Sequence, residues 1–143
     1  MAARRPFTDL DQLLAAADEL WKTLGRDDLL EAFGRHPRIG EKASQTSNPA
    51  PAATRRWSAE EQSAAGGASS SVLERLAKGN RAYERRYGYI FIVCATGKTA
   101  EEMLAILERR LQNDAAAELF VAGEEQRKIM HLRLRKLIAA DVP

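Results

Sequence analysis

The chain has 143 residues, of which 45% are hydrophobic and 29% are charged, proportions typical of a single globular domain with its own core. Its formal net charge of +2 is too small to argue for a nucleic-acid partner and suits an anionic small molecule. No apolar run approaches the roughly 20 residues that a membrane span needs, and the first residues lack the apolar stretch of a signal peptide. Cys94 is the single cysteine, which excludes an internal disulfide and favours a reducing compartment.

Two helices are predicted in the first 36 residues. Thr8 can cap the first helix, and Gly25 ends it. Its apolar residues recur every three or four positions, on one face: Phe7, Leu10, Leu14, Ala17, Trp21 and Leu24. Asp27 or Asp28 opens the second helix, which stops at His36 because a residue before proline is pushed out of the helical region.

A polar segment rich in proline, serine and threonine follows at residues 43–56 and predicts a mobile loop. Ser58 and Glu61 then have the spacing of a capping box, so a helix is expected to begin there. Gly66 and Gly67 interrupt it.

The next helix is predicted to end at Gly88 and carries Leu73, Leu76, Asn80, Tyr83 and Tyr87 at helical spacing. Asn80 lies on this apolar face and needs a hydrogen-bond partner if it is buried. Residues 89–95, YIFIVCA, favour a strand by propensity. Because no second segment of this kind could pair with it, an extended buried connector is equally expected.

Thr99 and Glu102 form a second capping box, and the helix that begins there is expected to run to about Gln112 with Met103, Leu107 and Leu111 inward. Asn113 or Asp114 starts a long last helix with the apolar residues Leu119, Phe120, Ile129, Met130, Leu134, Leu137 and Ile138. The sequence therefore predicts an all-α, single-domain bundle of about five or six helices with one extended segment near residues 89–95.

Two side chains outside helix interiors are candidates for catalysis, and each has a purely structural alternative. His36 either ends a helix or acts as a general acid and base, held in place by Pro37 and a turn at Gly40. No second histidine or cysteine stands at metal-ligand spacing from it, so a zinc site is not expected. Glu61 fits a capping box in any protein.

Further candidates could bind rather than react. Ser58 and Gln62 lie at a helix N-terminus, whose unpaired amides attract anions. Arg133 either packs its stem while its head reaches water, or offers a planar fork to a carboxylate. Residues 89–95 either form core or present backbone groups to a ligand. His131 is expected at the surface without a partner, and Arg135 and Lys136 on a solvated face.

Six segments, in this order, resemble the family of OHCU decarboxylases, which act on 2-oxo-4-hydroxy-4-carboxy-5-ureidoimidazoline in urate degradation. They are RPF at 5–7, HPRIG at 36–40, SAEEQSAAG at 58–66, NRAYERRYGYIFIVCA at 80–95, ERRLQND at 108–114 and LRLRKL at 132–137. The histidine–proline pair followed by S-x-x-E-Q and then N-x-x-Y is specific only as a combination.

The resemblance implies an all-helical cytoplasmic enzyme, usually a homodimer, that needs neither metal nor organic cofactor and has no nucleic-acid or membrane partner. It would decarboxylate its anionic substrate to (S)-allantoin. The catalytic histidine falls on His36 and the catalytic glutamate on Glu61. Substrate contacts fall on Pro37, Ser58, Gln62, the backbone of Phe91, Ile92, Val93, Cys94 and Ala95, and Arg133. Members usually have one or two helices before the RPF segment, so residues 1–143 are expected to form one such domain without the family's first helices.

Two other functions fit the same residues. In a non-catalytic interaction module, the capping boxes would only cap helices, and the basic residues 133–136 would face a partner. A cofactor-free hydrolase of a related ureido compound would use a similar set of polar groups.

Overall fold

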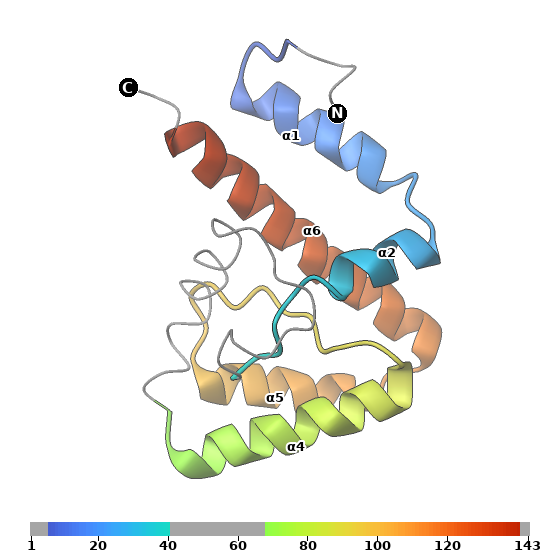
Figure 1. Ribbon diagram of the computed structural model, residues 1–143, viewed down its shortest axis with the longest axis vertical. Coiled ribbons are helices and arrows are strands. Elements are labelled where there is room, and N and C mark those ends of the chain that lie inside the picture. The colour runs from blue at the N-terminus through green and yellow to red at the C-terminus, as the bar shows by residue number, and fades with distance from the viewer. Residues whose placement is uncertain (1–5, 41–67, 141–143) are drawn as a thin grey trace.

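The computed structural model describes residues 6–40 and 68–140, and its helices are labelled in Figure 1. They are α1 (Leu10–Trp21), α2 (Arg26–Phe33), α4 (Ser70–Tyr87), α5 (Ala100–Arg110) and α6 (Ala115–Ala140). The described ranges contain five helices and no strand, so the prediction of an all-α domain is confirmed. None of these helices is long and apolar enough to cross a membrane.

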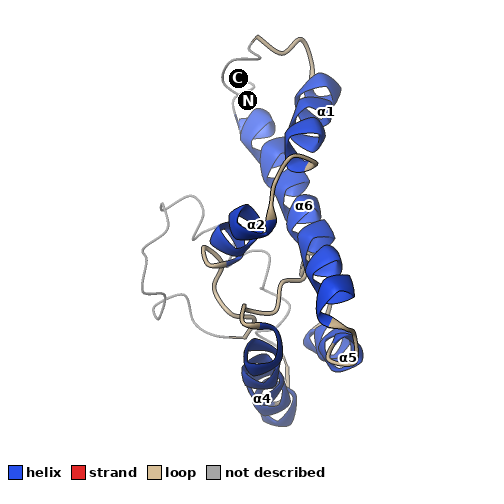
Figure 2. Cartoon of the chain, turned by 90° about the vertical axis from the view of Figure 1, so that its right-hand side faces the viewer, coloured by secondary structure: helices blue, strands red, loops and turns tan. Residues whose placement is uncertain are grey.

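Helices α4 and α5 pack closely against each other at one end of the molecule (Figure 2). Gly79 permits this approach, because a Cβ atom there would lie 2.6 Å from Cδ2 of Leu107. The interface between the two helices belongs to the larger of two buried apolar clusters, which includes Leu76, Tyr83, Phe91, Val93, Ala95, Met103 and Leu107. Thr99 and Glu102 form the predicted capping box at the start of α5.

Residues 89–95 lie outside any helix and form no strand within the described residues, so the buried connector forms and the strand does not. Gly88 ends α4 with φ of 81°, a left-handed conformation that favours glycine. Alternate side chains of the connector face two different clusters. Phe91 and Val93 join the cluster between α4 and α5, whereas Ile92 and Cys94 join a second cluster that contains Phe33, Ala122 and Ile129. The connector is therefore a core layer between these elements.

A buried polar network fixes one end of the connector. The Arg110 guanidinium donates to Glu118 through Nε at 2.8 Å and through Nη2 at 2.5 Å, and its Nη1 donates to the Ile92 carbonyl at 2.7 Å. The Tyr83 hydroxyl also donates to Glu118. The side chains of Arg110 and Glu118 are only 5% and 0% exposed, so the charges of both are paired inside the core rather than solvated.

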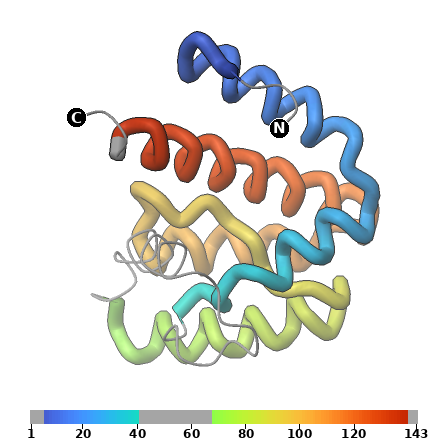
Figure 3. Tube along the Cα trace, turned by 45° about the horizontal axis from the view of Figure 1, so that its top comes forward, coloured from blue at the N-terminus to red at the C-terminus, as the bar shows by residue number. Residues whose placement is uncertain are grey.

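Helix α6 lies between α1 and the α4–α5 pair (Figure 3). Leu13, Leu14 and Ala17 are the buried residues of α1. Beside them, the Asp18 carboxylate lies 2.7 Å from Nε2 of His131 and 3.1 Å from Nη1 of Arg127. His131 therefore has a partner from a distant helix, and the prediction of an unpartnered surface histidine is wrong.

Several predicted helix ends are wrong, because a residue close to the predicted one caps or ends the helix. The side chain of Asp9, rather than that of Thr8, caps α1 by accepting from the Gln12 amide at 2.8 Å. Gly25 precedes α2, and Asp28 lies within the first turn, where it accepts from the Gly25 amide at 2.8 Å. Helix α2 ends at Phe33, three residues before His36, and α5 ends at Arg110. The predicted start of α6 at Asp114 is confirmed, since its carboxylate accepts from the amides of Ala116 and Ala117.

Part of the predicted core is exposed: Leu24, Phe120, Leu137 and Ile138. The reason is clearest for Phe120, which is 70% exposed. The inner face of α6 carries Glu118, Ala122, Gln126 and Ile129, and Phe120 lies about 200° around the helix from Ala122. Two polar residues thus occupy the buried face on which apolar residues alone were expected.

Candidate active site

His36 lies in a short segment directly after α2, and this helix fixes the start of the segment. After α2 ends at Phe33, the chain continues in a tight turn in which the His36 amide donates to the Phe33 carbonyl at 3.1 Å. Phe33 itself is fully buried in the cluster with Ile92 and Cys94. The turn therefore attaches the backbone of His36 to a buried residue of the core.

The residues after Pro37 attach the same segment to α4. The Arg38 guanidinium donates to Glu84 through Nε at 2.5 Å and through Nη2 at 3.2 Å. The Ile39 side chain is buried, and its carbonyl accepts from Nδ2 of Asn80 at 2.9 Å. The predicted need of Asn80 for a partner is thus confirmed. The segments on both sides of His36 are thus attached to helices.

Two side chains of α6 act on the imidazole of His36, Gln126 through a hydrogen bond and Arg133 through its charge. These residues are seven positions apart, which places them on one face of the helix two turns from each other. Burial lowers the pKa of His36, and the positive charge of Arg133 lowers it further, to about 4. His36 is therefore neutral near pH 7 and able to accept a proton.

Gln126 was not a candidate in the sequence analysis. A hydrogen bond from the imidazole to its side chain opposes the fall in the pKa of His36. Buried amide oxygens normally have partners, and the neighbour of this side chain is the His36 imidazole. The sequence did contain a signal for Gln126: it lies four positions after Ala122 and three before Ile129, on the apolar face of a helix. The same argument, a polar residue on an apolar face, singled out Asn80.

The connector passes the same region with several of its peptide groups already bonded. The Cys94 amide donates to Oε2 of Glu125 at 2.7 Å, and the Cys94 carbonyl accepts from Nζ of Lys98 at 2.7 Å. Burial tends to raise the pKa of Glu125, but hydrogen bonds from Lys128 and the Cys94 amide outweigh it and hold this pKa below its usual value. The side chains from Phe91 to Ala95 belong to the core, so the predicted contact of their backbone with a substrate stays a prediction.

Three candidate residues, Ser58, Glu61 and Gln62, lie outside the described residues, as do the predicted loop at 43–56 and the capping box that follows it. Of the predicted site, the structure brings together His36, Pro37 and Arg133. Within residues 6–40 and 68–140, no group of three or more histidine, cysteine, aspartate or glutamate side chains is arranged to hold a metal ion.

Comparison with known proteins tests the resemblance over nearly the whole sequence. Residues 1–135 match the model of the OHCU decarboxylase family. The chain belongs to this family.

Two curated relatives illustrate how this OHCU decarboxylase family member compares in length. The chain is 38% identical over 139 residues to the uric acid degradation bifunctional protein of Arabidopsis thaliana, covering 97% of this chain and 42% of that protein. It is 26% identical over 137 residues to the 2-oxo-4-hydroxy-4-carboxy-5-ureidoimidazoline decarboxylase of Haloferax volcanii, covering 96% of this chain and 77% of that one. The chain thus spans less than half of the bifunctional relative and most of the single-function one.

A solved structure extends the family likeness to three dimensions. The crystal structure of an OHCU decarboxylase in the presence of (S)-allantoin superimposes with a TM-score of 0.80 and 34% identity, and covers 96% of this chain and 87% of that one. At this similarity, the two chains share the same fold over nearly the whole of this chain.

Proposed function

We propose that this chain removes carbon dioxide from 2-oxo-4-hydroxy-4-carboxy-5-ureidoimidazoline and releases (S)-allantoin, with His36 as the proton-transferring residue. The observation that carries the proposal is a neutral imidazole, on a segment fixed at both flanks, beside an arginine. Membership of the OHCU decarboxylase family supports the same reaction.

The reaction needs a base and then an acid on one face of the ring. When the bond to the carboxylate breaks, its electron pair moves into the ring towards the adjacent C=N group. The substrate hydroxyl loses its proton and becomes a carbonyl, the ureido-bearing carbon gains a proton, and the ring nitrogen of the former C=N group takes up one more proton from water. Neutral His36 can accept the hydroxyl proton and return one to that carbon. Delivery to one face gives a single enantiomer of allantoin.

Arg133 is proposed to bind the substrate carboxylate before it leaves. A guanidinium offers two parallel donors to a carboxylate, which fixes both its position and its orientation. The bound anion would also offset the charge of Arg133, which lowers the pKa of His36 in the free protein. Substrate binding therefore raises that pKa and strengthens His36 as a base when it is needed.

The remaining predicted residues are proposed to hold the polar ring and the ureido group. Glu61 would accept a hydrogen bond from the substrate hydroxyl or orient His36, and Ser58 and Gln62 would bind ring and ureido atoms. Pro37 and the connector backbone would form the wall behind them. Gln126 joins this set, because its side chain interacts with the His36 imidazole and its amide group can hydrogen-bond to a ureido group placed there.

The proposal includes a cytoplasmic homodimer, as the resemblance implies. Light scattering coupled to size-exclusion chromatography would measure the mass of the full chain in solution. A mass near twice the 15.9 kDa of one chain is expected, and a single-chain mass at micromolar concentration would contradict the dimer without affecting the proposed chemistry.

The activity is tested with substrate made in place from urate by urate oxidase and hydroxyisourate hydrolase, because it decays spontaneously. Addition of the chain should speed the loss of the intermediate and give optically active allantoin, measured by absorbance and circular dichroism. An unchanged rate with racemic product would contradict the proposal and favour an interaction module. Release of the ureido group without carbon dioxide would instead indicate a hydrolase.

A further inference from the structure

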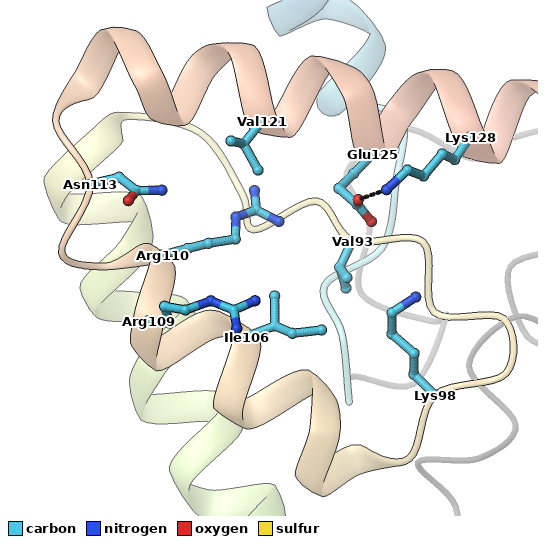
Figure 4. A pocket seen from close by; sticks show the side chains of 9 residues that line it. All are labelled: Val93, Lys98, Ile106, Arg109, Arg110, Asn113, Val121, Glu125 and Lys128. Atoms are coloured by element: carbon cyan, nitrogen blue, oxygen red, sulfur yellow. Dashed lines mark hydrogen bonds and ion pairs between the residues drawn. The ribbon is translucent and has the colours of Figure 1, made fainter.

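A second cavity lies between α5, α6 and the connector, with a volume of about 270 Å³ (Figure 4). His36, Gln126 and Arg133 are not among the described residues that line it. One water molecule takes about 30 Å³ of liquid volume, and pockets for drug-sized ligands begin at about 300 Å³. The cavity therefore suits a ligand of several non-hydrogen atoms, separate from the proposed substrate.

The lining of this cavity combines apolar and cationic side chains. Val93, Ile106 and Val121 supply aliphatic surface, whereas Lys98, Arg109, Arg110 and Lys128 supply positive charge. Glu125 is the carboxylate in the described lining. Figure 4 shows these groups converging from α5, α6 and the loop after the connector.

The positive charges of the cavity are only partly compensated. Arg110 is paired with Glu118 inside the core. Lys128 lies 2.5 Å from Oε1 of Glu125, and the same carboxylate also interacts with the charge of Lys98. No other described side chain forms a hydrogen bond or ion pair with the guanidinium of Arg109, which is exposed at the end of α5. Apart from Arg110, the described lining therefore has three cationic side chains and one carboxylate, that of Glu125.

We propose that this cavity binds a small organic carboxylate. Its hydrocarbon part would contact Val93, Ile106 and Val121, and its carboxylate would accept hydrogen bonds from Arg109 and Lys98. The planar fork of arginine fits a carboxylate. The aliphatic lining favours an organic anion over inorganic phosphate. The hydrocarbon part of an organic anion would remove this apolar surface from water, whereas phosphate has no apolar part and would leave the surface hydrated.

Binding in the cavity is linked to the connector through the peptide of Cys94. Glu125 accepts from its amide, and Lys98 donates to its carbonyl. A carboxylate that draws Lys98 towards Arg109 changes the hydrogen bond to the Cys94 carbonyl. The Cys94 amide is therefore a sensitive reporter of occupancy, even though its side chain faces the other cluster.

The test is a titration of the ¹⁵N-labelled full chain with butyrate at constant ionic strength, followed by amide chemical shifts. The amides of Val93, Cys94, Ile106 and Val121 should shift together and saturate. Butyramide has the same shape without the charge and should bind at least about tenfold more weakly, because a hydrogen bond to a charged group contributes more than a neutral one. No saturable shift with butyrate, or equal shifts with butyramide or inorganic phosphate, would overturn the proposal.

Variants locate the site. Arg109→Gln should weaken butyrate binding by about tenfold while the rest of the spectrum is retained. Lys98→Gln should weaken it through the second donor. Arg81→Gln is the matched control, since Arg81 is also an exposed helical arginine but does not line the cavity. Wild-type affinity in both cavity variants, or equal loss in the control, would contradict binding at this place.

Discussion

The charge of Arg133 acts on the His36 imidazole, although the two residues are almost a hundred positions apart in the sequence. Burial and the guanidinium charge together keep the imidazole neutral in the free protein. In the proposed function, His36 acts as the base and Arg133 binds the substrate carboxylate. Binding of that anion would reduce the effect of the guanidinium on the imidazole, so substrate binding would raise the pKa of His36.

The low pKa of His36 makes a prediction about stability and pH. The ordinary pKa of 6.5 falls to about 4 in the folded chain, so between these values the unfolded chain binds more protons at this site. Protonation therefore favours unfolding as the pH falls from about 6.5 to 4. The difference in melting temperature between wild type and His36→Asn should decline over this window, because the variant lacks the group. An NMR titration of the imidazole that gave a pKa near 6.5 would contradict this.

Arg133 variants separate binding from packing. Arg133→Lys keeps the charge and most of the stem but loses the planar fork, so KM should rise with little change in melting temperature. Arg133→Gln also removes the charge and should raise the pKa of His36. Steady-state kinetics and the imidazole titration measure both effects. An unchanged KM in the lysine variant would mean that Arg133 contributes only the packing of its aliphatic stem and does not bind the substrate.

Helical spacing and local signals predicted much of the fold but not its polar interior. The capping box at Thr99, the end of α4 at Gly88 and the buried Asn80 follow from nearby residues, and the structure has all three. The pairing of Arg110 with Glu118 could not be predicted in this way, because the two residues lie on different helices and Tyr83, which also donates to Glu118, is 35 positions away. The same holds for the contact between His131 and Asp18.

The candidate site was predictable to a similar degree. The proline after His36 indicated that the helix would stop before it, although α2 ends three residues earlier than expected. That Arg133 and Gln126 approach His36 depends on how α6 crosses α2 and the connector, and spacing within one helix carries no information on that crossing. The sequence left two alternatives for Arg133, and the resemblance to a family favoured a substrate contact, whereas the contact of Gln126 with His36 appears only in three dimensions.

The pairing of Arg110 with Glu118 predicts a large loss of stability when one partner is removed. Arg110→Met leaves a buried carboxylate without its cation and the Ile92 carbonyl without its donor. The free energy of unfolding should fall by about 3–5 kcal/mol. Arg75→Met is the control: it breaks an ion pair with Glu108 whose side chains are 60% and 49% exposed, and should cost less than about 1 kcal/mol. Denaturant unfolding of both variants decides this, and similar losses would refute a special role for the buried pair.

The most direct test of the central claim is the turnover of freshly made substrate by His36→Asn, compared with wild type and with His131→Asn. Loss of the acid–base group should lower the rate roughly 100- to 10,000-fold and leave the residual product racemic. His131→Asn weakens the contact between α1 and α6, and should retain the wild-type rate and product handedness. Near wild-type turnover by His36→Asn, with optically active (S)-allantoin, would contradict the assignment of His36 as the proton-transferring residue.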